Sequence, residues 1–265
     1  MRKNYIGFWL ILACAFVIFA VISALDSFKI GDWEPKSSEI VPTLTGANKQ
    51  QTRQAVTGAA KRAAQTKPKQ GIPAPLDTAS KTILFLGDSM LEGLSPRLAH
   101  YAHANGHKLY SVIWYSSTTE IWAQSGKITK YINEIHPDYI FISLGGNELF
   151  VTDIIKKRDK FVKQILKEIG DIPFVWIGPP NWKPDTGIND MIASNVPQGE
   201  FFLSDGMHFD RSRDGAHPTR ESAILWMDSI ARWMPLHAAH PIKMTKPAAR
   251  EGRPEHVYVH QPDER

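Results

Sequence analysis

The stretch Thr82-Ile83-Leu84-Phe85-Leu86-Gly87-Asp88-Ser89 indicates the fold of this chain. Its continuous apolar run is typical of a strand that is buried on both faces of a parallel sheet. The Gly-Asp-Ser turn that follows would hold the Ser89 hydroxyl at the carboxyl edge of that sheet, where open α/β folds carry their chemistry. The triplet alone is common by chance, so its meaning depends on the rest of the chain.

Strands and helices alternate from residue 81 to residue 235. The candidate strands are Thr82–Leu86, Lys108–Trp114, Tyr139–Leu144, Pro173–Gly178 and, more weakly, Glu200–Ser204. The candidate helices are 95–105 (begun by Ser95-Pro96), 120–134, 158–169 and 219–234. This alternation with short links predicts a three-layer α/β/α sandwich on a mostly parallel sheet.

Two further polar segments follow other parts of this pattern. Gly145-Gly146-Asn147-Glu148 comes after the third strand, and Asp214-Gly215-Ala216-His217-Pro218 precedes the last helix. A serine, an asparagine and an aspartate three residues before a histidine are, in that order, the parts of a hydrolytic serine site.

On these three segments the domain resembles the SGNH hydrolases, the superfamily of GDSL-type esterases and acyltransferases. The resemblance covers about residues 82–235 and three of the family's four sequence blocks, with Glu148 where the family usually has aspartate. It implies a flavodoxin-like α/β/α sandwich and an acyl-serine mechanism.

The chemistry of the side chains suggests a role for each residue of this set. Ser89 is the candidate nucleophile, which needs a neighbouring base. His217 is the candidate base, and Asp214 would fix its tautomer. The Asn147 amide and the Ser89 backbone N–H would bind the developing oxyanion.

The second family block departs from the pattern. The family places a glycine after the second strand, and its backbone N–H is the third oxyanion donor, whereas this chain reads Trp114-Tyr115-Ser116-Ser117-Thr118-Thr119. Because the donor is a main-chain group, Ser116 or Ser117 can supply it, and the sequence leaves the choice open.

Several other residues are candidates for secondary roles. Asp205 and His208 repeat the Asp-x-x-His spacing, but the proline and amphipathic helix after His217 favour the later pair. Asp88, Trp122, Trp182 and His208 are the candidate substrate-binding residues, and the loop 181–198 would wall one side of the cleft. We expect no metal at the histidines 100, 103 and 107 and no cofactor.

The N-terminus carries an uncharged apolar run from Tyr5 to Leu25, the length that a helix needs to cross a bilayer. Arg2 and Lys3 precede it, so we expect an uncleaved signal anchor with the N-terminus in the cytoplasm and the domain outside. A cleaved signal peptide, or a lipoprotein processed at Cys14, is the alternative.

This prediction divides the chain into four parts. They are residues 1–30 with the membrane anchor, a flexible linker at 31–80, the hydrolase-like domain at 81–235 and a disordered tail at 236–265. The linker and the tail are polar and rich in proline, a composition that cannot bury enough surface to fold on its own.

The net charge of the chain is only +4 over 265 residues, and no basic stripe with interleaved aromatic residues marks a nucleic-acid partner. We therefore expect a single-pass protein of the inner membrane whose periplasmic esterase hydrolyses O-acyl esters, O-acetyl esters foremost, on a polysaccharide or peptidoglycan. One alternative is an O-acetyltransferase that works with a multispanning membrane partner, and another is a non-catalytic envelope binding module.

Overall fold

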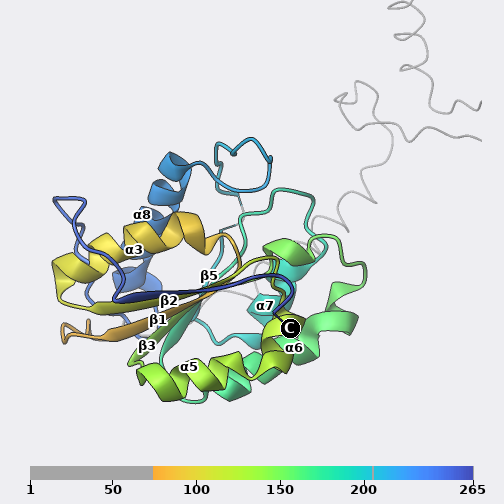
Figure 1. Cartoon of the computed structure of the whole chain (residues 1–265), viewed down its shortest axis with the longest axis horizontal. Helices are drawn as coiled ribbons and strands as arrows, with labels where there is room; N and C mark the ends of the chain where they lie inside the picture. The colour runs from red at the N-terminus through yellow and green to blue at the C-terminus, as the bar shows by residue number, and fades with distance from the viewer. Residues whose placement is uncertain (1–73, 205, 265) are drawn as a thin grey trace, which may run out of the picture. The chain divides into compact units, whose positions relative to one another are not determined.

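Parallel strands form a single sheet in the computed structural model, which describes residues 74–204 and 206–264 (Figure 1). The strands are β1 (Thr82–Gly87), β2 (Lys108–Trp114), β3 (Tyr139–Ser143), β4 (Phe174–Ile177), β5 (Phe201–Phe202) and β6 (His256–His260). Their order is β5-β4-β3-β1-β2-β6, and every neighbouring pair is parallel. Apart from β6, this is the order of a flavodoxin-like, doubly wound sheet. The predicted parallel α/β fold is confirmed.

Helices cover both faces of the sheet (Figure 1). On one face lie α3 (Leu91–Asn105) and α8 (Arg220–His237), and on the other lie α4 (Thr119–Ser125), α5 (Lys127–Ile135), α6 (Ile154–Ile169) and α7 (Ile188–Asn195). Strand β1 is buried on both sides because its side chains alternate between the two cores: Ile83 and Phe85 join α3 and α8, whereas Leu84 and Leu86 join the other layer. The strand order reverses between β1 and β3, and because the strands are parallel the carboxyl ends of β1, β2 and β3 lie at one edge of the sheet.

The prediction of a disordered tail at 236–265 is wrong for its described part, residues 236–264. Strand β6 pairs with β2 from His256 opposite Tyr110 to His260 opposite Trp114. A polar segment needs no core of its own when it adds to the edge of an existing sheet, because the edge supplies its backbone hydrogen bonds. The indole of Trp114 also donates a hydrogen bond to the Gln261 carbonyl at 2.9 Å.

Three helix predictions need correction. Helix α3 begins at Leu91 and runs through Pro96, because the burial of its apolar residues outweighs the hydrogen bond that proline cannot make. The predicted helix 120–134 is two helices, α4 and α5, separated by Gly126 at φ 67°. The predicted loop 181–198 contains α7, whose Ile188, Met191 and Ile192 are buried at helical spacing.

The predicted membrane anchor at residues 5–25 and the linker up to residue 73 lie outside the described residues. From residue 74 onward, the structure contains no helix that is both long enough and apolar enough to cross a bilayer.

Candidate active site

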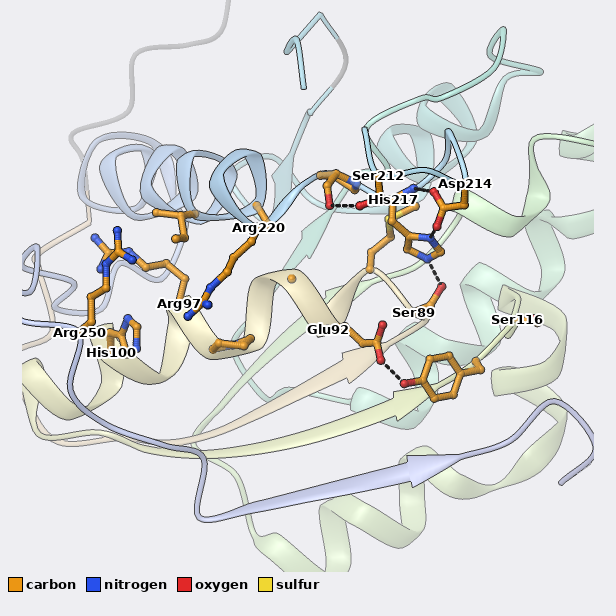
Figure 2. Close-up of a pocket in the computed structure, with 17 residues that line it drawn as sticks. Ser89, Glu92, Arg97, His100, Ser116, Ser212, Asp214, His217, Arg220 and Arg250 are labelled. Carbon is orange, nitrogen blue, oxygen red and sulfur yellow. Dashed lines mark hydrogen bonds and ion pairs between the residues drawn. The ribbon is translucent and has the colours of Figure 1, made fainter. Parts of the chain in front are cut away.

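Ser89, His217 and Asp214 form a continuous hydrogen-bonded chain at the carboxyl edge of the sheet (Figure 2). The Ser89 Oγ lies 2.7 Å from His217 Nε2, and His217 Nδ1 lies 2.8 Å from Asp214 Oδ2. Ser89 follows β1, while the other two residues share the loop before α8. Segments 128 residues apart therefore meet as the sequence predicts.

The partners of the imidazole determine its tautomer. Nδ1 faces a carboxylate, which only accepts hydrogen bonds, so Nδ1 carries the proton. In the neutral ring Nε2 then has a free lone pair and accepts the hydrogen bond that the Ser89 hydroxyl donates. This is the arrangement that a general base needs before it removes the serine proton.

A tight turn holds Asp214 against the histidine. Its Oδ1 accepts the backbone N–H groups of His217 at 3.0 Å and of Ala216 at 2.8 Å. These bonds, together with the His217 ring, lower the pKa of Asp214 to about 2, so the carboxylate stays charged. Arg211 fixes the same loop, because its guanidinium donates to the carbonyls of Ala216 and of Pro180.

The nucleophile sits where β1 passes into α3. Asp88, the residue before it, is 1% exposed and accepts the Met90 N–H at 3.0 Å. Burial raises the pKa of Asp88 to about 7. Asp88 therefore shapes the turn and cannot touch a substrate, which corrects its predicted substrate-binding role. The helix that begins at Leu91 directs its positive end toward Ser89.

The loop after β2 distinguishes between the two candidate serines for the missing glycine. Ser116 has a φ of 56°, the left-handed region that favours glycine, whereas Ser117 is not among the residues of positive φ. In the described part of the chain the exposed Ser116 N–H has no hydrogen-bond acceptor, while the Ser117 N–H donates to Trp114. Ser117 is buried, and its hydroxyl accepts the Trp122 indole N–H at 2.9 Å. The geometry thus assigns the glycine position, and the free N–H, to Ser116.

Replacing Ser116 with glycine is expected to stabilise the protein by about 0.5–1 kcal/mol, because a Cβ in the left-handed region costs about 1–2 kcal/mol and glycine is more flexible when unfolded. Ester turnover should persist, since the N–H remains. The matched variant Ser117→Gly should instead lose about 1–3 kcal/mol, because it leaves the buried Trp122 N–H unpaired. Urea unfolding of the three proteins tests this, and a destabilised Ser116→Gly would contradict it.

Asn147 lies on the short 3-10 helix Gly146–Glu148 after β3. One N–H of its amide donates to the Ser117 carbonyl at 2.9 Å, and the other N–H has no acceptor among the described residues. Glu148 is fully buried, binds Thr119 through that residue's hydroxyl and backbone N–H, and has a pKa that burial raises. It therefore anchors the Asn147 loop to the segment after β2.

The other predicted site residues differ in their exposure and in their distance from Ser89. Trp122 is fully buried and packs edge-on against Trp114, so its predicted contact with substrate is wrong. Trp182 is half-buried, and its indole donates to the Gly146 carbonyl at 3.2 Å beside the Asn147 loop. His208 is exposed away from the pocket that contains Ser89, and Asp205 lies outside the described residues.

A pocket of about 610 Å³ opens from Ser89, His217 and Asp214 along α3 (Figure 2). Beside Ser89 its wall carries Glu92, which accepts a hydrogen bond from the Tyr115 hydroxyl. The far wall carries Arg97, Arg220 and Arg250, which no motif in the sequence marks, and His100, at which the sequence predicted no metal. The sequence indicates the placement of Arg97 and His100 through their spacing, because Gly93, Arg97 and His100 lie on one face of α3. Within the described ranges there is no group of three or more His, Cys, Asp and Glu side chains placed to hold a metal.

No family model and no curated protein match the chain. Among solved structures, a psychrotrophic esterase from Pseudoalteromonas sp. is 18% identical over 57% of this chain and 97% of its own, with a TM-score of 0.43. A family 3 carbohydrate esterase from Clostridium thermocellum is 17% identical over 58% of this chain and 94% of its own, with a TM-score of 0.42. A protein from Desulfitobacterium hafniense, ascribed to the lipolytic G-D-S-L family, is 12% identical over 57% of this chain and 98% of its own, with a TM-score of 0.39. At such low scores, the chemistry below rests on the geometry of this chain alone.

Proposed function

We propose that this protein is a serine esterase that hydrolyses O-acyl esters, O-acetyl esters foremost, on an extracytoplasmic glycan. The observation that carries the proposal is the chain of hydrogen bonds from Ser89 through His217 to Asp214. It joins a nucleophile, a base of the correct tautomer and a charged carboxylate at the mouth of one pocket.

The reaction follows from this geometry. His217 Nε2 takes the Ser89 proton while Oγ attacks the ester carbonyl carbon, and the same proton then passes to the oxygen of the leaving alcohol. Water, activated by His217, attacks the acyl-serine and releases the carboxylic acid. The N–H groups of Ser89 and Ser116 and the free N–H of Asn147 supply the oxyanion donors, each typically worth about 2.7–4 kcal/mol in the transition state.

Two separate features support a glycan substrate and an extracytoplasmic location of the domain. Support for a sugar substrate comes from an aromatic pair beside the Asn147 loop: Phe150 is 62% exposed and meets the Trp182 ring edge-on at 5.5 Å. Such amphipathic rings offer apolar faces on which sugars stack. Support for an extracytoplasmic domain comes from the sequence alone, through the apolar run 5–25 and the positive charges before it.

Covalent trapping tests the mechanism. A fluorophosphonate loses fluoride when an activated serine attacks its phosphorus, so intact-mass spectrometry of the full-length protein should show one adduct, and peptide mapping should place it on Ser89. Ser212 lines the same pocket without touching His217 Nε2, so Ser212→Ala should label normally. Labelling of another residue, or none, would refute the serine mechanism.

Product analysis separates hydrolysis from transfer. Full-length protein is incubated with a chromogenic acetyl ester and a glycan oligomer, and both free acetate and acetylated glycan are followed by mass spectrometry. Free acetate as the main product supports the esterase. Acetyl groups that accumulate on the glycan would replace it with the O-acetyltransferase.

A further inference from the structure

The pocket that begins at Ser89 ends in a cluster of basic side chains. Figure 2 shows Arg97, His100, Arg220 and Arg250 together at the end of the pocket away from His217, and all four line it. We call these four residues the basic end. They come from three separate parts of the chain: α3, the start of α8 and the segment before β6.

Arg97 is the fixed member of the basic end. It is 6% exposed, and its Nε bonds Asp228 Oδ1 at 2.7 Å. Asp228 also accepts the Tyr101 hydroxyl at 3.0 Å and lies 3.5 Å from Lys246 Nζ. Because this one carboxylate already serves two cations, it cannot neutralise the other arginines.

Arg220 and Arg250 have no carboxylate within ion-pair distance anywhere in residues 74–204 and 206–264. Arg220 is also the first residue of α8, so its charge lies at the positive end of the helix dipole, where a cation is unfavourable. Both residues are exposed, so their charges are solvated and accessible to a ligand. An anion bound between the guanidinium groups would pair with both of them through bidentate hydrogen bonds and would also be favoured by the positive end of the helix dipole.

His100 completes this surface as a neutral group. Its Nδ1 is shielded from solvent and meets no hydrogen-bond partner among the described residues. Burial lowers the pKa of His100, and the charges of Arg97, Arg250 and Arg220 lower it further. The imidazole therefore has an unused polar atom in the field of three arginines.

The distance from the nucleophile indicates which part of a substrate would carry the anion. Arg97 lies six residues beyond Leu91, the first residue of α3, which is about 9 Å of rise along the helix. An acetyl group bound at Ser89 is too short to span that gap. The anion would therefore lie on the alcohol part of the ester, at a distance from the scissile bond.

We propose that the basic end binds a carboxylate or phosphate group of the glycan whose ester is held at Ser89, so that the substrate is an acidic, acylated glycan. This inference rests on the proposed esterase for the position of the ester. The binding of the anion does not depend on the esterase, because Arg97, Arg220 and Arg250 would bind it without turnover.

The kinetic test compares acetate release from O-acetylated oligogalacturonate and from an O-acetylated neutral xylo-oligosaccharide of equal length. For the full-length protein we expect kcat/KM to favour the acidic substrate about tenfold or more, as for charge-assisted hydrogen bonds. Arg220→Gln with Arg250→Gln should remove most of this preference. The matched control is Arg232→Gln, which removes the same charge from an exposed position of α8 outside the pocket.

A binding test makes the inference independent of turnover. In the Ser89→Ala protein, calorimetric titrations would compare trigalacturonate, glucose 6-phosphate and neutral maltotriose, and the first two distinguish a carboxylate from a phosphate. At least one anion should bind about tenfold tighter than maltotriose, and the gap should shrink in the double arginine variant and at high salt.

The outcomes separate the two proposals. If the wild-type protein hydrolyses no ester but the anion binds selectively, the proposed esterase is refuted and the proposed anion site is supported. Turnover that depends on Ser89 with equal rates and affinities for acidic and neutral oligosaccharides would keep the esterase and overturn the anion site. An anion preference that survives Arg220→Gln with Arg250→Gln would also overturn it.

Discussion

Replacing Ser89 with alanine is expected to lower kcat for ester hydrolysis by about 10⁴-fold or more. Alanine removes the oxygen that lies 2.7 Å from His217 Nε2, so no acyl-enzyme can form. The backbone N–H of residue 89 and the loops of Ser116 and Asn147 remain. The residual rate above the uncatalysed reaction then measures what the oxyanion donors and binding contribute alone. Initial rates with a neutral acetyl ester, at saturating concentration, provide the measurement.

Two further variants make this result specific to the proposed mechanism. His217→Ala should cost about as much as Ser89→Ala, and the double variant should be no slower, because residues that act as a unit are not additive. The free energy of unfolding of Ser89→Ala should stay within about 0.5 kcal/mol of wild type, since Ser89 is only half-buried. A Ser89→Ala protein that is folded and fully active would refute the role of this serine.

Asp228→Ala is expected to have the largest effect on stability, a loss of about 3–5 kcal/mol. Asp228 is 4% exposed, and its carboxylate is the partner of the buried Arg97 and of the Tyr101 hydroxyl. Although burial alone would raise the pKa of Asp228, the hydrogen bonds from Arg97 and Tyr101 lower it, so the ion pair is the favoured state. Without the carboxylate, a charged guanidinium stays buried beside the other arginines of the basic end.

Urea unfolding at neutral pH measures this loss, and two control variants identify its cause. Asp228→Asn keeps an acceptor for Arg97 but no charge, so it should lose less than Asp228→Ala. Lys246→Gln removes a largely exposed cation 3.5 Å from the same carboxylate and should change stability by less than about 1 kcal/mol. A loss below about 1 kcal/mol for Asp228→Ala would show that Arg97 finds another partner.

Much of the fold could be predicted from local patterns. The apolar runs of β1, β3 and β4 and the polar turns after β1 and β3 are short-range signals, and a parallel sheet aligns their carboxyl ends without further information. The order Ser89, Asn147, Asp214, His217 therefore predicted residues that the structure gathers around one edge. Their chemical roles stay a proposal until turnover is measured.

The features that could not be predicted depend on tertiary contacts. Trp122 is a candidate substrate-binding residue in the sequence, but in the structure it packs in the core against Trp114. The choice between Ser116 and Ser117 depends on a backbone angle that no local residue preference indicates. The basic end joins Arg97, Arg220 and Arg250, which are scattered in the sequence and meet only when α3, α8 and the segment before β6 are in place.

The position of β6 affects the order in which the proposed active site and the basic end can form during folding. Tyr110 pairs with His256, which is far along the chain, and such distant pairings form late because the long intervening segment must close first. The segment that carries Arg250 lies against α3, close to Ala99 and His103, only once β6 has joined the sheet. During synthesis the strands before it emerge earlier, so the serine and its histidine can assemble ahead of the complete pocket. Ribosome-bound chains in which α8 has emerged but β6 has not would therefore react with a small phosphonate before they could discriminate between acidic and neutral oligosaccharides.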